Sequence, residues 1–407
     1  MPAQLRLTVL LVLSCVVGLG GFGAFATALP TLMAEWRLAN AEAGWISGAY
    51  FIGYVAAVPV LVGLTDHADS RKIYLVGCGA GTIGGLGFAL LAEGFWSAAF
   101  FQVFAGAGLA GIYMPGLRVL GERLPEDKRL RSVAYYTSMF GVGTSVSFLT
   151  AGLLDAAFGW RSMFLWGGIG SFVAALLMIA AVAGLPLVME KKPATGRHPL
   201  DFRPVFTNRP ALGYILAYGG HSFELFAVRA WMVAFLLYAW SRSSAEPAGL
   251  AISQWVTVCM LVGVATSILG AELARLIGRI ALVRWIAGAS AVVGLATGLA
   301  TSLPFWVVAA LMFVYSALIA ADSGTITTGT VAEARPDEQG ATLAVHSMVG
   351  FAGGIVGPPL AGLALDLGGN VTPVGWAMAL AVCAAGSAIA ALAVGFASRV
   401  SRTASGS

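Results

Sequence analysis

Charged side chains are scarce in this chain. Asp, Glu, Lys and Arg make up only 10% of its 407 residues, whereas 58% are hydrophobic, and the mean hydropathy is +0.86. A soluble domain of this length could not solvate so apolar a surface, so the composition excludes a soluble globular protein. We therefore expect lipid to be its main solvent.

Cysteine and the common catalytic motifs are also rare or absent. The four cysteines are isolated in apolar stretches, which gives neither a disulfide framework nor a paired-thiol metal site. The sequence has no glycine-rich loop ending in Gly-Lys-Ser/Thr, no HExxH and no Gly-x-Ser-x-Gly. We therefore expect no bound cofactor, no catalytic metal, no ATP-driven pumping and no enzyme activity.

Long apolar stretches are what the chain does contain. A spanning helix needs about 20 apolar residues, and twelve stretches of that kind are present. They are residues 9–33, 44–64, 73–92, 97–120, 133–154, 163–188, 211–239, 249–273, 281–302, 305–331, 341–365 and 372–396. The first also resembles a secretory signal, but removing it would break the two-fold repeat described next, so an uncleaved spanning helix is favoured.

The two halves of the chain are related by an internal repeat. LGERLPEDKR at residues 120–129 aligns with VAEARPDEQG at residues 331–340, and AGLLD from Ala151 aligns with AGLALD from Ala361 after a slip of one residue. Parallel repeats of this kind are a transporter architecture. We predict an all-α membrane protein of twelve transmembrane helices in two pseudo-symmetric bundles, residues 1–187 and 210–407, joined by a basic cytoplasmic linker at residues 188–209.

The positions of Lys and Arg predict the orientation. Most of the 23 basic residues fall on the side that holds both termini and the linker. The exceptions are Arg37, Arg161 and Arg242 on the other side, and Arg118 and Arg229 within helices. This bias places both termini in the cytoplasm. The net charge of +4 is then a topology signal and does not indicate nucleic-acid binding. The Ala/Gly-rich chain with short loops is typical of a bacterial cytoplasmic membrane protein.

The loop after the second apolar stretch, GLTDHADSRK at residues 63–72, resembles the loop signature of the major facilitator superfamily. Asp66 matches the aspartate of that signature and Arg71 its last basic position. His67, Asp69 and Ser70 replace an arginine, a glycine and an arginine. The fourth stretch also departs from proton-linked members, because Gln102 stands where they often carry an arginine. The resemblance covers the whole chain at the level of architecture.

The resemblance implies a cytoplasmic latch. We expect Asp66 and Arg71 to fasten the inward-facing ends of the two halves, with Glu122 as the carboxylate for Arg71, because a carboxylate is stabilised at a helix start and arginine can clamp it. The repeat predicts a matching pair, Arg279 with Glu333. The alternative is that these are ordinary positive-inside loop charges.

The seventh stretch carries the richest set of ionisable side chains, in YGGHSFELFAVRAWM at residues 218–232. A central charge costs about 2.5 to 3.5 kcal/mol on insertion scales, so such residues are functional candidates. A rise of about 1.5 Å per residue puts Glu224 near the bilayer middle and Arg229 roughly 7 Å outward. His221 shares a face with Glu224, and Tyr218 extends it. We predict that Glu224 binds and releases a proton, with His221 as its partner or as a substrate contact. The alternative is a structural His-Glu-Arg cluster.

Three further side chains are candidates. Asp322, in the hydroxyl-rich tenth stretch, would face Glu224 across the cavity that the resemblance implies. Arg118 would close an inner gate or extend to lipid headgroups, the second being favoured. His346 is expected to make a gate contact or pack at an interface.

These features together predict a secondary transporter that works by alternating access. We expect it to bind no nucleic acid and to use no ATP. We expect a small polar or charged organic solute as cargo, protons as the coupling ion, membrane lipids as surroundings and a monomer. The alternatives are efflux of amphipathic drugs, a transition-metal permease using His and carboxylate ligands, and a sensor of the same fold that binds without transport.

Overall fold

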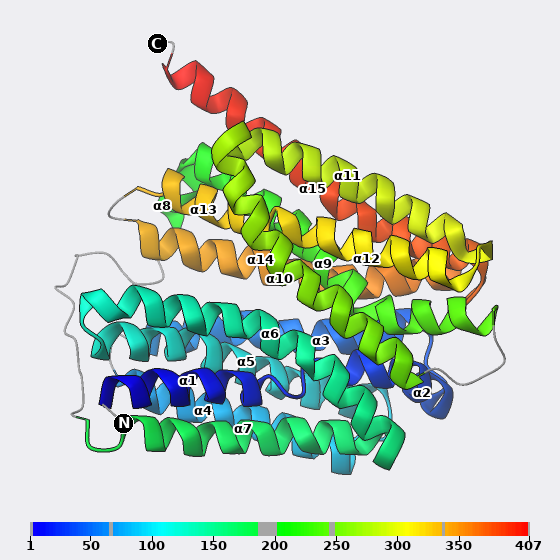
Figure 1. The fold of residues 1–407 in the computed structure, drawn as a ribbon, viewed down its shortest axis with the longest axis horizontal. Coiled ribbons are helices and arrows are strands. Elements are labelled where there is room, and N and C mark those ends of the chain that lie inside the picture. The colour runs from blue at the N-terminus through cyan, green and yellow to red at the C-terminus, as the bar shows by residue number, and fades with distance from the viewer. Residues whose placement is uncertain (1–2, 65–67, 186–201, 244–248, 336–337, 406–407) are drawn as a thin grey trace. The chain divides into compact units, whose positions relative to one another are not determined.

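The computed structural model describes residues 3–64, 68–185, 202–243, 249–335 and 338–405 (Figure 1). Every regular element in these ranges is a helix. Eleven helices are long and apolar enough to span a membrane, and a shorter apolar helix, Gln4–Gly18, precedes them. The prediction of an all-α membrane protein is confirmed.

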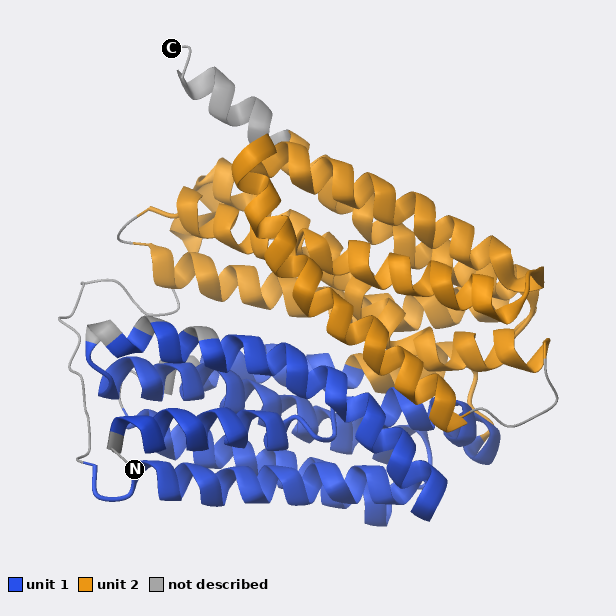
Figure 2. Cartoon of the chain, viewed as in Figure 1, with its two compact units in different colours: residues 1–36, 49–197 blue, residues 37–48, 198–407 orange. Residues whose placement is uncertain are grey.

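The contacts within the chain divide it into two compact units (Figure 2), residues 1–36 with 49–197 and residues 37–48 with 198–407. The sequence did not predict that residues 37–48 group with the second unit. The predicted domain boundaries remain a prediction, because residues 186–201 of the linker lie outside the described ranges.

The first unit consists of helices packed around α4 and α5. It holds α1 (Ala3–Gly18), α2 (Ala24–Trp36), most of α3 (Asn40–Leu64), α4 (Ser70–Leu91), α5 (Phe95–Arg123), α6 (Glu126–Phe158) and α7 (Trp160–Val182). The predicted single helix over residues 9–33 is wrong in one respect, because α1 and α2 are separate helices. Five turn residues, 19–23, interrupt the span, and three of them are glycines, which weaken a helix.

Glycines bring the backbones of α4 and α5 into direct contact. A Cβ on Gly77 would lie 2.5 Å from the Cα of Gly111, and one on Gly108 would lie 2.6 Å from the Cα of Gly81. Only glycine fits at such distances. Lipid does not drive helices together by the hydrophobic effect, so close packing of this kind is a main source of helix association in a membrane.

The second unit is built around α9 (Arg209–Ser241), which packs against α14 (Gln339–Leu367) and α15 (Pro373–Ser405). Its other helices are α8 (Arg203–Thr207), α10 (Gly249–Ile277), α11 (Arg279–Leu299), the 3-10 turn η1 (Ala300–Ser302), α12 (Phe305–Ala321) and α13 (Ser323–Glu333). Asp366 of α14 accepts hydrogen bonds from the backbone N–H groups of Asn40 and Ala41 at 3.1 and 2.9 Å. This carboxylate caps the start of α3, which explains why residues 37–48 belong to this unit.

A second interrupted span lies in this unit. The predicted helix over residues 305–331 is divided into α12 and α13 at Asp322, whose backbone has φ −93° and ψ −14°. The break is limited to this one residue, because its dihedral angles stay in the right-handed helical region and Phe305–Glu333 together form one apolar segment long enough to span a membrane. The Asp322 side chain therefore lies at the junction of α12 and α13.

Candidate functional site

Helix α9 buries two of the predicted ionisable residues completely. The side chains of His221 and Glu224 are 2% and 1% exposed, and both lie in the middle part of a helix of 33 residues. We expected His221 to act as the partner of Glu224 or as a substrate contact. The structure instead gives them different neighbours, so the direct His221–Glu224 partnership is corrected.

Glu224 is surrounded by three hydroxyl groups from three other helices. Its Oε1 accepts from Tyr315 Oη of α12 at 2.8 Å and from Ser290 Oγ of α11 at 3.2 Å. Its Oε2 accepts from Ser387 Oγ of α15. All three partners are buried. Glu224 thus ties α9 to the helices that surround it.

These hydroxyls suit both protonation states of the carboxyl group. The ionised form accepts from all three donors. The protonated form can donate to one of them, because a hydroxyl hydrogen rotates and the oxygen also accepts. Glu224 can therefore gain or lose a proton without a change of partners, which is compatible with the predicted proton site and also with a structural role.

His221 pairs with the aspartate at the interrupted span. Its Nδ1 lies 2.8 Å from Oδ1 of Asp322, and the two side chains are 2% and 5% exposed. The contact joins α9 to the junction of α12 and α13. A buried imidazole and carboxylate at this distance share a proton readily, and the pair changes its net charge by one when a proton enters or leaves.

Aromatic rings extend this pair along one side of α9. The ring of Tyr218 stacks on His346 of α14 with 3.9 Å between centroids and a 15° interplanar angle, and lies 5.7 Å from the ring of His221. His346 is held by Thr330 at 3.0 Å from Nδ1 and by Thr327 at 3.4 Å from Nε2. His346 therefore belongs with the Asp322–His221–Tyr218 group, which the sequence did not predict.

Arg229 lies five residues beyond Glu224 on α9 and interacts electrostatically with Tyr218. Its guanidinium carbon lies 5.9 Å from the ring centroid of Phe226. It also lines a small cavity with Met232, Cys259 and Ser316.

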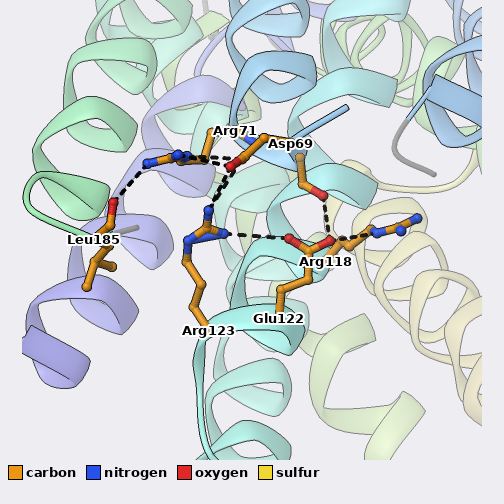
Figure 3. Close-up of polar contacts among 7 residues, drawn as sticks. Asp69, Arg71, Arg118, Glu122, Arg123 and Leu185 are labelled. Carbon is orange, nitrogen blue, oxygen red and sulfur yellow. Dashed lines mark hydrogen bonds and ion pairs between the residues drawn. The ribbon is translucent and has the colours of Figure 1, made fainter. Parts of the chain in front are cut away.

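A second charged cluster lies at the loop before α4 (Figure 3). Asp69 accepts from the backbone N–H of Arg71 at 2.9 Å, from Nε of Arg71 at 3.0 Å and from Arg123 at 3.0 Å. Arg71 also donates to the carbonyl oxygen of Leu185 at 3.4 Å. The side chains of Asp69 and Arg123 are only 2% and 3% exposed, so this is a buried ion pair that also caps α4.

The pKa of Asp69 lies below its ordinary value. Burial alone would raise it, but the two hydrogen bonds from Arg71 and the positive charges of Arg123 and Arg71 together outweigh that effect. Each of these groups interacts favourably with the ionised carboxylate only. Asp69 is therefore ionised at neutral pH, and its charge belongs to the native fold.

The predicted direct pair of Arg71 with Glu122 is corrected by this geometry. Glu122 instead contacts Arg118 at 2.8 Å, Arg123 at 3.6 Å and the hydroxyl of Ser70 at 2.9 Å. Arg123 lies between the two carboxylates and joins them (Figure 3). Arg118 thus has a carboxylate partner one turn away on α5. Asp66, the other predicted latch residue, lies outside the described residues.

The matching pair expected from the repeat is not formed. Arg279 and Glu333 are both exposed, and among the described residues neither a hydrogen bond nor an ion pair joins their side chains. The backbone oxygen of Glu333 accepts from Asn208 at 2.7 Å. The repeat preserved these residue types, but the contacts they make differ between the two units.

The described residues contain no group of three or more His, Cys, Asp or Glu side chains placed to hold a metal ion. His221 and Asp322 form a pair of ligand types, and His346 is bonded to threonines instead.

Several contact residues were missed from the sequence, namely Ser290, Tyr315, Ser387, Asp69 and Arg123. Hydroxyl groups in Ala/Gly-rich spans were a weak signal for the first three, because small polar residues are common in membrane helices and most serve packing. Asp69 was seen only as a departure from a motif. Asp69 caps α4 because that helix begins at Ser70, a boundary that the sequence did not give.

Comparison with known proteins identifies the family. The family model for the Major Facilitator Superfamily matches residues 10–358. The chain belongs to this superfamily. Members are membrane transporters, and the proteins of similar structure are transporters and not enzymes.

Relatives within the Major Facilitator Superfamily match parts of the chain. The niacin transporter NiaP of Acinetobacter baylyi is 24% identical over 258 residues, which is 54% of this chain and 58% of that protein. The probable sphingolipid transporter spinster homolog 2 of Arabidopsis thaliana is 25% identical over 179 residues, 44% of this chain and 34% of that protein. The chain therefore spans between a third and three fifths of these relatives.

Solved structures of the superfamily match nearly the whole chain. An inward-facing bacterial homolog of the human lysosomal transporter Spinster has a TM-score of 0.78 at 17% identity, over 99% of this chain and 98% of that one. A D-xylose-proton symporter has a TM-score of 0.78 at 15% identity, over 96% and 97%. These matches show that the chain has the twelve-helix fold of these transporters.

Proposed function

We propose that this protein is a proton-coupled secondary transporter that moves a small polar or charged organic solute by alternating access. The observation that carries the proposal is the buried contact of His221 with Asp322 at the interrupted span between α12 and α13. Membership of the Major Facilitator Superfamily and the niacin transporter among its relatives support transport of a small organic solute.

The His221–Asp322 pair is the proposed coupling site. Ionisable groups inside a membrane are costly and are kept where they serve a substrate or ion path. Uptake of a proton by the pair changes the local charge by one, so a charged or strongly polar solute binds one state better than the other. That difference in affinity couples the movement of the proton to the movement of the solute.

Glu224 is proposed as a second proton site that does not touch the solute. Its carboxyl oxygens are occupied by Tyr315, Ser290 and Ser387, so the side chain has no oxygen directed at a substrate. Its protonation would instead alter how strongly α9 is held by α11, α12 and α15. Tyr218, stacked on His346, is the proposed solute contact beside the coupling pair.

We further propose that the protein resides in the cytoplasmic membrane of a bacterium, as a monomer with both termini in the cytoplasm. The positive-inside distribution of Lys and Arg supports this orientation. The arrangement of Asp69, Arg123 and Glu122 at one end of α4 and α5 would then lie on the cytoplasmic side.

Flux measurements in proteoliposomes test the proposal. A panel of organic acids, bases and neutral solutes is first screened for binding by thermal shift, and a hit is then assayed for uptake with and without an imposed pH gradient. Asp322→Asn should abolish accumulation driven by the gradient but retain exchange of labelled for unlabelled solute, because exchange needs no net proton movement. Glu272→Gln, at a side chain 59% exposed on α10, is the matched control and should behave as wild type.

Different outcomes identify the alternatives. Gradient-driven accumulation by Asp322→Asn at the wild-type rate would overturn coupling at this pair. Binding of a solute without any flux would identify a sensor, and transport confined to amphipathic cations would identify a drug efflux protein.

A further inference from the structure

A small cavity lies inside the first unit, away from every ionisable group discussed above. It is bordered by the interrupted first span, by α4, α5 and α7, and by Tyr50 of α3. Its volume is ≈ 40 Å³. An ordered water needs about 10–15 Å³, whereas an engineered cavity of about 150 Å³ is needed for benzene. The cavity thus has room for about three waters and not for an organic ring.

Gln102 of α5 is a polar side chain that borders this cavity. It is 6% exposed. Among the described residues its amide group makes no hydrogen bond, and the cavity is the space beside it. A side-chain amide has two donors and an acceptor, and burying them without partners costs free energy. The amide therefore requires a partner that the protein does not supply.

The backbone of the interrupted span supplies a second unpartnered group at the same cavity. The N–H groups of Leu19, Gly20, Phe22 and Gly23 donate to Cys15 O, Val17 O, Leu19 O and Ser147 Oγ at 2.9 to 3.1 Å. The N–H of Gly21, which also borders the cavity, donates to no acceptor in the described part of the chain. Gly21 is half-buried, and a backbone N–H group without a protein acceptor is normally satisfied by water.

The residues that line the cavity also indicate whether a charged or a neutral molecule would bind there. None of the residues that border the cavity is Asp, Glu, Lys, Arg or His. The carboxyl end of α1 and the amino end of α2 both meet here, so their partial charges of opposite sign largely cancel. An ion would be poorly stabilised, whereas a neutral molecule that both donates and accepts would suit Gly21 and Gln102.

We propose that this cavity is a hydration site, in which ordered water bridges the Gly21 N–H and the Gln102 amide. Water satisfies the groups that the interruption between α1 and α2 leaves without protein partners. It also allows the first span to remain interrupted inside the bundle, since the freed backbone groups keep their hydrogen bonds. The proposal is independent of solute identity and of proton coupling.

The direct test is a structure of the wild-type protein at a resolution that shows water. Density for water within about 3.2 Å of both Gly21 N and the Gln102 amide is expected. An empty cavity, or density for lipid or detergent in it, would overturn the proposal.

A substitution provides a second test. Gln102→Leu keeps the side-chain size but removes the amide, while Gln254→Leu makes the same change at an exposed position of α10. If water is bound, Gln102→Leu should lower the melting temperature by on the order of 2 °C relative to Gln254→Leu, because bound water loses a partner. An unchanged or raised melting temperature would indicate a dry cavity with an unsatisfied amide, and would contradict the proposal.

Discussion

Gly386 of α15 lies against Gly220 of α9. A Cβ on Gly386 would be 2.5 Å from the carbonyl oxygen of Gly220 and 2.9 Å from Cβ of Glu224, and a Cβ on Gly220 would be 2.6 Å from the carbonyl oxygen of Gly386. This backbone contact places the next residue, Ser387, on the Glu224 carboxylate. The packing of two glycines thus sets the geometry of a buried acidic group.

Gly386→Ala should therefore destabilise the second unit. The added methyl group forces α15 away from α9 and weakens the Ser387–Glu224 hydrogen bond, and overpacking of this kind costs about 1–3 kcal/mol. Thermal unfolding followed by tryptophan fluorescence in detergent measures the change. Gly288→Ala on α11 is the control, since nothing lies within 4 Å of its added Cβ. Equal melting temperatures for the two variants would argue against the contact.

Removing both partners of the His221–Asp322 pair should cost less than the sum of the costs of removing each partner alone. A buried charge left without its partner destabilises by about 3–5 kcal/mol. We expect His221→Gln and Asp322→Asn each to lower the melting temperature, and the double variant to lower it by clearly less than the sum. A double-mutant cycle then gives a coupling free energy of about 1–3 kcal/mol. Strictly additive effects would show that the two side chains do not interact.

Tyr218 should act through its ring. Stacking on His346 needs an aromatic face and no hydroxyl group, so Tyr218→Phe should keep solute affinity within about threefold, whereas Tyr218→Ala should lose about tenfold or more, the equivalent of roughly 1.4 kcal/mol. Equilibrium binding of the solute identified by the thermal-shift screen measures both. Comparable losses in the two variants would assign the role to the hydroxyl group.

The stability of the first unit should depend on pH through Asp69. Its native pKa lies below the ordinary value, so the folded state favours the ionised carboxylate. The resulting stabilisation is fully present above the unfolded-state pKa of about 3.9 and is lost as the pH falls through the lower native value. Melting temperature should accordingly decrease as the pH falls below about 4.

Asp69→Asn isolates this effect. The variant should be less stable than wild type at pH 7, and the difference should shrink as the medium is acidified. Glu272→Gln, whose carboxylate pairs with Arg275 at an exposed site, should show no such convergence. A difference between Asp69→Asn and wild type that stays constant with pH would contradict the assignment.

The fold followed from the sequence because the membrane imposes strong, local constraints. Apolar length marks each span, the repeat relates the halves, and the loop at residues 63–72 indicates the family. The main errors of the prediction from sequence concern short breaks within the predicted helices. Three glycines near Gly21 and a single aspartate at Asp322 divide two spans, and a hydropathy pattern averages over such short features.

The sequence by itself determined that this is an all-α membrane protein, and it predicted which apolar helices carry the ionisable residues. Only the tertiary structure decided which of them meet. His221 and Glu224 are three residues apart on one helix, yet one contacts Asp322 and the other Tyr315, Ser290 and Ser387. The reason is that helical rise fixes depth along the chain, whereas the partner of a side chain depends on which neighbouring helix approaches. That approach is set by glycine contacts between distant segments, as at Gly220 and Gly386.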